Sequence, residues 1–149
     1  MGMTRGRRAE PEHVEQAMLF DWAERASGRT PELKLLFAIP NAGGYTGGFK
    51  ANVARVMKMK REGVKSGVPD LMWPVARGRY HGLFIEMKAG PTSRVRPEQK
   101  EWHAALRAQG YAVRVCYSWD AARDTIERYN GLGAGSALTE PTEPIRGVA

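Results

Sequence analysis

The chain has 149 residues and a mass of 16.5 kDa, which is enough for one domain with its own hydrophobic core. Hydrophobic residues make up 42% and charged residues 26% of the sequence, which excludes the compositions of disordered, collagen-like and membrane-embedded chains. With 23 Lys and Arg residues against 16 Asp and Glu residues, the formal charge is +7 and the pI about 9.9. This basic excess favours a polyanionic partner such as nucleic acid.

Cysteine and histidine are too few for a structural disulfide or zinc site. The single cysteine is Cys116, and the three histidines, His13, His81 and His103, have no zinc-ligand spacing. We expect a buried Cys116 and surface or hydrogen-bonding roles for the histidines. The basic N-terminus is not followed by an apolar stretch, so we expect a cytoplasmic protein without membrane association.

The first half of the chain reads as helix, strand, helix. After a basic, flexible N-terminus (residues 1–10), a helix is predicted from Pro11, with Gly28 as its stop. The apolar run 33–39 predicts a buried strand, although periodicity alone allows a short helix. A glycine-rich loop (41–48) then leads into a helix over 49–62.

The second half predicts two strands, a helix, a strand and a helix. The strands cover 70–75 and 81–89, and the helix over 97–109 is expected to turn Trp102, Ala105 and Leu106 inward. A strand over 111–117 precedes a last helix that Ser118 caps and that extends through Tyr129. The order α-β-α-β-β-α-β-α predicts an α/β fold with a mixed sheet flanked by helices, in one domain over 11–130. Residues 131–149, rich in Gly and Pro, predict a mobile tail.

Most of the net positive charge lies in residues 50–65, which carry six basic residues and one acid. A solvated helix face is one interpretation. Because oppositely charged partners for intrahelical pairs are nearly absent, a surface that contacts phosphates is the other. The candidate DNA-binding residues are Lys50, Arg55, Lys58, Lys60, Arg61 and Lys65.

The strand with the sequence Leu-Phe-Ile-Glu-Met-Lys (83–88) carries the strongest chemical signal. Strand side chains alternate between faces, so Glu86 and Lys88 project together, away from the layer of Leu83, Ile85 and Met87. Asp70 opens the preceding strand, and pairing of the two strands brings it within reach of Glu86. Two carboxylates beside a lysine suit a hard divalent cation such as Mg²⁺. The alternative is an ordinary Glu86–Lys88 ion pair with Asp70 capping a turn.

Two more polar residues fit the same cleft. Glu15 lies among apolar residues of the first helix, where a lone carboxylate is costly without a partner, although a half-exposed helix glutamate is an equal alternative. Gln99 shares a helix stripe with Trp102 and Leu106, so its amide can point inward and hydrogen-bond a phosphate or an active-site group. A solvated first-turn glutamine is the alternative.

Taken together, these segments resemble a stand-alone VRR-NUC domain, a branch of the PD-(D/E)XK nuclease superfamily. The resemblance extends from about Glu15 to Tyr129 and depends on three motifs: IPNAGG (39–44), GVKSGVPDL (63–71) and GLFIEMK (82–88), together with Glu15-Gln16 and Gln99. It implies that Asp70, Glu86 and the Met87 carbonyl hold Mg²⁺ or Mn²⁺, and that Lys88 lies beside the attacking water. It gives Glu15 and Gln99 as further active-site positions, Glu15 as a candidate metal ligand.

The function that follows from this resemblance is metal-dependent DNA cleavage. Family members of similar size from phages and bacteria are structure-specific nucleases, and several act as dimers on four-way junctions. We therefore expect a homodimeric endonuclease that resolves four-way (Holliday) junctions in DNA repair. Two alternatives stay open: a nuclease that acts on flaps, nicked or linear DNA, and a DNA-binding module without catalytic activity.

Overall fold

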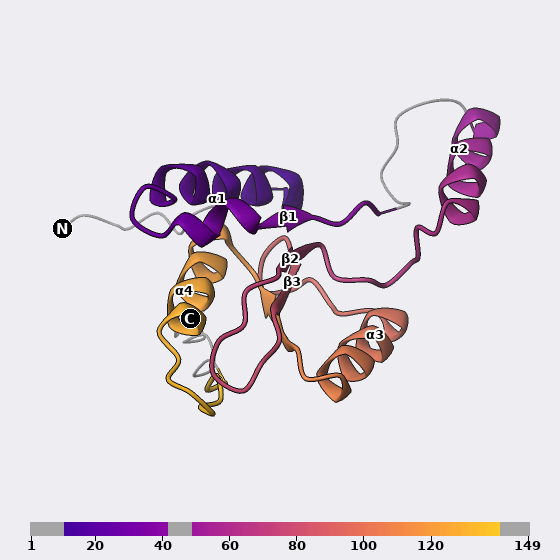
Figure 1. Cartoon of the computed structure of the whole chain (residues 1–149). Coiled ribbons are helices and arrows are strands. Elements are labelled where there is room, and N and C mark those ends of the chain that lie inside the picture. The colour runs from indigo at the N-terminus through magenta and orange to yellow at the C-terminus, as the bar shows by residue number, and fades with distance from the viewer. Residues whose placement is uncertain (1–10, 42–48, 141–149) are drawn as a thin grey trace.

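The computed structural model describes residues 11–41 and 49–140 (Figure 1). Its helices are α1 (Glu12–Ala26), the 3-10 helix η1 (Pro31–Leu35), α2 (Phe49–Arg61), α3 (Pro97–Ala108) and α4 (Trp119–Asn130). Its strands are β1 (Phe37–Ala38), β2 (Leu71–Trp73), β3 (Leu83–Met87) and β4 (Ala112–Cys116). The expected α/β architecture and its order of α-helices and strands are confirmed.

The four strands form one mixed sheet in the order β1-β2-β3-β4. β1 pairs antiparallel with β2, and β2 antiparallel with β3, so that Leu71 lies opposite Ile85. β3 and β4 run parallel, joined by the crossover through α3, with Leu83 beside Ala112 and Met87 beside Cys116. β3 is central, and all five of its residues are buried.

The two faces of the sheet have different coverings. Leu83, Ile85 and Met87 of β3 belong to the hydrophobic core, together with the buried faces of α1 and α4. α3 packs on the other side, against β4, and buries two polar residues, Gln99 and His103. The predicted inward position of Ala105 is wrong, because that residue is exposed. Glu86 therefore points toward α3 and away from the hydrophobic core.

Local sequence signals explain where the helices near the sheet begin. Pro97 occupies the first turn of α3, where a missing N–H costs nothing, and the Arg96 N–H donates to Gln99 Oε1 (2.9 Å). Ser118 caps α4 by accepting from the Ala121 N–H (3.3 Å), as the sequence predicts. These caps fix the ends of α3 and α4 relative to the strands that precede them.

Residues 33–39 differ from the predicted buried strand. Pro31 starts the 3-10 turn η1, and only Phe37 and Ala38, both exposed, form the edge strand β1. Leu33 and Leu36 are buried, three residues apart, which matches the three-residue period of a 3-10 turn rather than the alternation of a strand.

Residues 131–140 also differ from the prediction of a mobile tail. Leu138 is buried, its N–H donates to the Tyr80 hydroxyl (3.1 Å), and its carbonyl accepts from Arg114 (2.8 Å). The Ser136 carbonyl accepts from the Arg79 N–H (3.0 Å). This segment therefore extends the domain to Glu140, and the rest of the predicted tail, 141–149, lies outside the described residues.

α2 stands apart from the sheet and the other helices (Figure 1). None of its 13 residues is buried, and Phe49, Val53 and Met57 are 84%, 42% and 60% exposed. An isolated helix of this length is marginal in water, so α2 gains little stability from the domain that carries it. Over residues 11–41 and 49–140, no helix has both the length and the apolar character needed to cross a membrane.

Candidate active site

β3 brings Glu86 and Lys88 to the same side of the sheet, as their alternation predicts. Glu86 and Lys88 are 2% and 6% exposed, and Lys88 Nζ lies 3.5 Å from Glu86 Oε1. The Lys88 N–H continues the ladder beyond β3 by donating to the Cys116 carbonyl (2.9 Å). A buried carboxylate and a buried ammonium group thus meet at the carboxyl end of β3.

Gln99 of α3 connects these two charged groups. Its Nε2 donates to Glu86 Oε1 (2.6 Å), and its Oε1 accepts from Lys88 Nζ (3.0 Å) as well as from the Arg96 backbone. The side chain is 3% exposed, which excludes the interpretation as a solvated first-turn glutamine. Because both ends of the amide are bonded, Gln99 fixes the orientation of Glu86 and Lys88.

Asp70 reaches the same group from the segment just before β2. Its Oδ2 accepts from the Met87 N–H (2.7 Å), and its carboxyl group interacts with that of Glu86. The loop that carries it packs tightly on α3: Gly67 has φ +88°, and a Cβ there would lie 2.8 Å from the Glu98 carbonyl oxygen. Glycine at position 67 is thus part of what positions Asp70.

The electrostatics of the carboxylate pair favour a bound cation. Burial, followed by the charge of Glu86, raises the pKa of Asp70 to about 7. Glu86 Oε2 is buried and, among the described residues, has no hydrogen-bond partner. An unsatisfied carboxylate oxygen beside a second carboxyl group is an arrangement that a divalent cation satisfies. The donors of this site therefore fit such an ion.

The ligands that the site offers are few. In the described part of the chain, no three His, Cys, Asp or Glu side chains are grouped so that they could hold a metal. Asp70, Glu86 and the Met87 carbonyl are the predicted ligands, and a cation held by them keeps coordination positions for water or a phosphate oxygen. Mg²⁺, which retains several waters in proteins, suits a site of this kind.

Glu15 is buried, but its observed contact is with α4. Its Oε2 accepts from the Trp119 N–H (2.7 Å) at the first turn of that helix, where a carboxylate is favourable. The glutamate of α1 whose charge acts on Asp70 is instead Glu12, which the sequence interpretation did not single out. Burial thus excludes the half-exposed interpretation of Glu15, and its part in the reaction stays a prediction.

His103 is the residue that the sequence interpretation missed. It is 4% exposed, and its Nε2 lies 3.7 Å from Glu86 Oε2. The expected surface role is wrong for His103 because the residue is buried, and its Nε2 has no hydrogen-bond partner among the described residues. The available signal was its spacing of four from Gln99, which places both side chains on one face of α3.

The six candidate DNA-binding residues lie outside this group, on α2 and just after it. All six, Lys50, Arg55, Lys58, Lys60, Arg61 and Lys65, are exposed. Lys58 makes a long ion pair with Glu62 (3.9 Å) in which both side chains stay largely exposed. Such a pair adds little stability, and it leaves the positive charge of the segment accessible to a ligand.

Comparisons with known proteins agree with this geometry. A model of the VRR-NUC domain matches residues 45–120, about half of the chain. A solved structure described as a VRR_NUC domain protein is 32% identical, with a TM-score of 0.70, over 87% of this chain and 98% of the other. A second, described as a VRR_NUC domain, is 23% identical with a TM-score of 0.47, over 79% and 96% of the two chains.

The comparison with curated proteins gives no match. The family match includes Asp70, Glu86, Lys88 and Gln99, the residues that the fold brings together. In its sequence and in its fold the chain therefore belongs to the VRR-NUC domain family, a PD-(D/E)XK-type nuclease family, and has a nuclease-type function in DNA processing.

Proposed function

We propose that this chain is a Mg²⁺- or Mn²⁺-dependent endonuclease that hydrolyses phosphodiester bonds of branched DNA, with the four-way junction as its substrate. The observation that carries the proposal is the half-buried Asp70 beside the buried Glu86, which the amide of Gln99 joins to Lys88. A structural ion pair needs one acid and one base. The second carboxyl group exceeds what an ion pair with Lys88 needs, and a divalent cation would compensate its negative charge.

Asp70, Glu86 and the Met87 carbonyl would hold the metal. When bound, the ion stabilises charge on the scissile phosphate and lowers the pKa of a coordinated water. Met87 would serve twice, because its N–H fixes Asp70 (2.7 Å) and its carbonyl would be a ligand of the metal. Glu15 stays a candidate for the surrounding water network, through the carboxylate oxygen that Trp119 does not use.

Lys88 and Gln99 supply positioning and positive charge. Lys88 Nζ has three protons; one is donated to Gln99 Oε1, and a second is available to the ion pair with Glu86 (3.5 Å). The third can hydrogen-bond the attacking water or a phosphate oxygen on which charge develops. Gln99, fixed by the Arg96 backbone, keeps Lys88 from turning away when the substrate arrives.

A homodimer is the assembly that matches this substrate. One site cuts one strand, whereas resolution of a four-way junction needs two cuts in symmetric positions, and a two-fold dimer supplies two identical sites in that relation. Phe49, Val53 and Met57 repeat every four residues along α2, a helix without buried residues. We assign this apolar face to contact with the second subunit, while the basic residues of α2 contact DNA.

The test of the activity is a cleavage assay on end-labelled DNA with Mg²⁺, Mn²⁺ or EDTA. The substrates are a four-way junction, a flap, a nicked duplex and a linear duplex of the same sequence. We expect metal-dependent, paired cuts in the junction and little cleavage of the linear duplex. Lys88→Met should stop cleavage, whereas Lys34→Met, an exposed lysine of η1, should not. Binding without cleavage under every condition would leave the DNA-binding module as the correct interpretation.

A further inference from the structure

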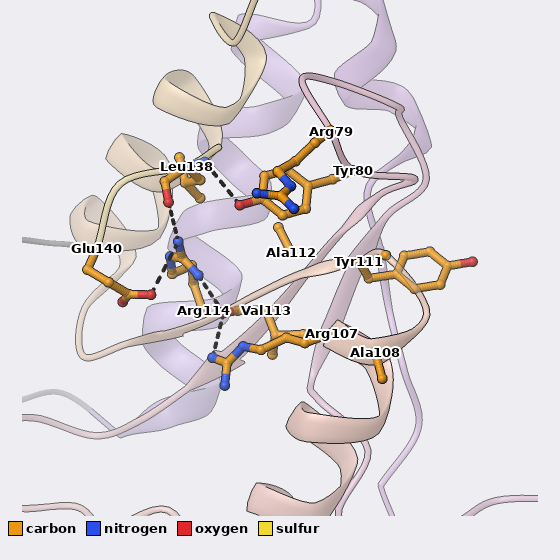
Figure 2. A pocket seen from close by; sticks show the side chains of 11 residues that line it. Arg79, Tyr80, Arg107, Ala108, Tyr111, Ala112, Val113, Arg114, Leu138 and Glu140 are labelled. Carbon is orange, nitrogen blue, oxygen red and sulfur yellow. Dashed lines mark hydrogen bonds and ion pairs between the residues drawn. The ribbon is translucent and has the colours of Figure 1, made fainter. Parts of the chain in front are cut away.

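A surface region outside the candidate active site lies along β4, the last strand of the sheet. A cavity of about 460 Å³ is formed there by the start of β4, the end of α3, residues 79–80 and the segment 138–140 (Figure 2). Along β4, the cavity begins at Ala112, beside Leu83, whereas the candidate active site lies at the Cys116 end. The lining continues along β4 to Arg114, beside Ile85, and it includes none of Asp70, Glu86, Lys88 and Gln99.

The described residues that line this cavity carry a positive charge. Three are arginines, Arg79, Arg107 and Arg114, and one, Glu140, is acidic. Arg79 is exposed, and its backbone N–H donates to the Ser136 carbonyl (3.0 Å). Guanidinium groups that converge on a cavity are typical of phosphate recognition, because each presents several donors in one plane.

Arg114 is buried, and its ion pair with Glu140 is long. Its side chain is 9% exposed, and its two terminal nitrogens donate to the carbonyls of Val113 (3.0 Å) and Leu138 (2.8 Å). Its Nε has no partner among the described residues. In that pair Glu140 Oε1 lies 3.7 Å from Arg114 Nη2, on a side chain that is 82% exposed. Carbonyl groups do not neutralise the charge, so an anion in the cavity would gain from it.

The end of α3 does not oppose an anion as strongly as a free helix C-terminus would. The Arg107 carbonyl accepts from the Gly110 N–H (3.0 Å), and the Leu106 carbonyl accepts from the Tyr111 N–H (3.2 Å). Arg107 also donates through Nη2 to the Val113 carbonyl (3.0 Å). The guanidinium groups thus dominate the electrostatics of the cavity.

We propose that this cavity binds a phosphate group of a nucleotide, supplied by a DNA strand or by a free mononucleotide, and that Glu140 competes with this phosphate for Arg114. If the phosphate comes from a DNA strand, the inference rests on the proposed function, because the phosphate then belongs to the bound substrate. If it comes from a free mononucleotide, the inference does not depend on the proposed function.

The experiment measures phosphate affinity without cleavage. In EDTA, dAMP and inorganic phosphate are titrated by calorimetry, and a fluorescent four-way junction by anisotropy at several salt concentrations. Arg79→Gln should weaken binding by about two- to five-fold, and Glu140→Gln should strengthen it by a similar factor, as expected for single, partly solvated charges. Arg25→Gln, on the exposed face of α1, removes the same charge elsewhere and should change little.

The two sources of the phosphate, a free nucleotide and a DNA strand, predict different effects of these variants on affinity. Opposite effects of Arg79→Gln and Glu140→Gln on dAMP or phosphate affinity support a site for a free nucleotide. The same opposite effects on the junction alone support a backbone phosphate. If all variants bind every ligand like the unmodified protein, or if Glu140→Gln weakens binding, the inference is wrong. Phosphate binding at this cavity in a protein that cleaves no DNA would refute only the proposed function.

Discussion

Asp70 is half-buried and lies beside the buried Glu86, so that their carboxylates repel each other when both are ionised. The chain reduces this repulsion through hydrogen bonds from the Met87 N–H to Asp70 and from Gln99 Nε2 to Glu86. Lys88, 3.5 Å from Glu86, supplies one positive charge. One positive charge does not neutralise two carboxylates, so the site keeps a net negative charge when both are ionised. The predictions for single residues follow from this negative charge.

Removing either carboxylate should abolish cleavage without loss of DNA binding. Glu86→Ala and Asp70→Asn each delete a proposed metal ligand and a negative charge that repels phosphate, so cleavage should fall by about 100-fold or more while affinity is kept or improved. The assay is junction nicking with Mg²⁺, with anisotropy for binding. Asp21→Asn, an exposed residue of α1, is the matched control. Cleavage retained by both variants would remove the site assignment, and loss of fold would support a structural ion pair.

The metal-free protein should become less stable as the pH rises. The pKa of Asp70 is raised from 3.8 to about 7 by burial and by Glu86, so between these values the folded chain holds a proton that the unfolded chain releases. The contribution of this group to stability is therefore complete below pH 3.8 and is lost as the pH rises through about 7. Urea unfolding in EDTA should show this slope for the unmodified protein and a flatter profile for Asp70→Asn. A profile that is identical in the two proteins contradicts the raised pKa.

At the scale of the elements, α2 and segment 131–140 differ in how closely they pack against the rest of the domain. α2 has no buried residue, whereas segment 131–140 is held by Leu138 and by hydrogen bonds to Arg79 and Tyr80. α2 therefore contributes to intermolecular contacts, and the segment contributes to the stability of the fold.

The basic side of α2 should control the salt dependence of DNA binding. Replacement of Lys58, Lys60 and Arg61 by Gln should lower affinity for all DNA substrates and reduce the slope of log K against log salt by about 0.9 for each phosphate of duplex DNA that is no longer neutralised. Turnover at saturating DNA should change much less. Exchange of Arg25, Lys34 and Arg128, exposed residues outside α2, removes the same charge and should leave the slope unchanged. Equal slopes for the two triple variants would exclude α2 as a phosphate-binding face.

Truncation should distinguish the contribution of segment 131–140 to stability from that of residues 141–149. A chain that ends after Asn130 loses the burial of Leu138 and exposes Arg114, so we expect a destabilisation of about 2–5 kcal/mol, the range for loss of a large buried side chain. A chain that ends after Glu140 keeps these interactions and serves as the control. Thermal or urea unfolding distinguishes the two, and equal stability of both truncated chains would show that segment 131–140 contributes nothing to the fold.

At the scale of the whole molecule, the proposed dimer can be tested by mixing subunits. Light scattering should give about twice 16.5 kDa. Heterodimers of unmodified and Glu86→Ala subunits should nick a four-way junction once and leave it unresolved, because only one of the two sites is active. A monomer that still makes paired, symmetric cuts would contradict this assembly.

The apolar face of α2 gives the assembly a second test. Phe49→Ser with Met57→Ser should shift the protein toward a monomer and uncouple the two cuts, since these side chains are exposed within the subunit. Leu35→Ser, an equally apolar and exposed position on η1, is the control for a change of surface polarity alone. Light scattering that reports dimers for both variants would place the interface elsewhere.

The sequence by itself determined the order of the α-helices and strands, the alternation that puts Glu86 and Lys88 on one face of β3, and the family. These features follow from local periodicity, caps and motifs, which neighbouring residues determine. Four features emerged only from the tertiary structure. They are the contact of His103 with Glu86, the hydrogen bond from the Trp119 N–H to Glu15 at the start of α4, the packing of Leu138 and the arginine-lined cavity. Each of them joins residues of different elements, and the identity of a buried polar group's partner depends on how those elements pack, which local sequence does not encode.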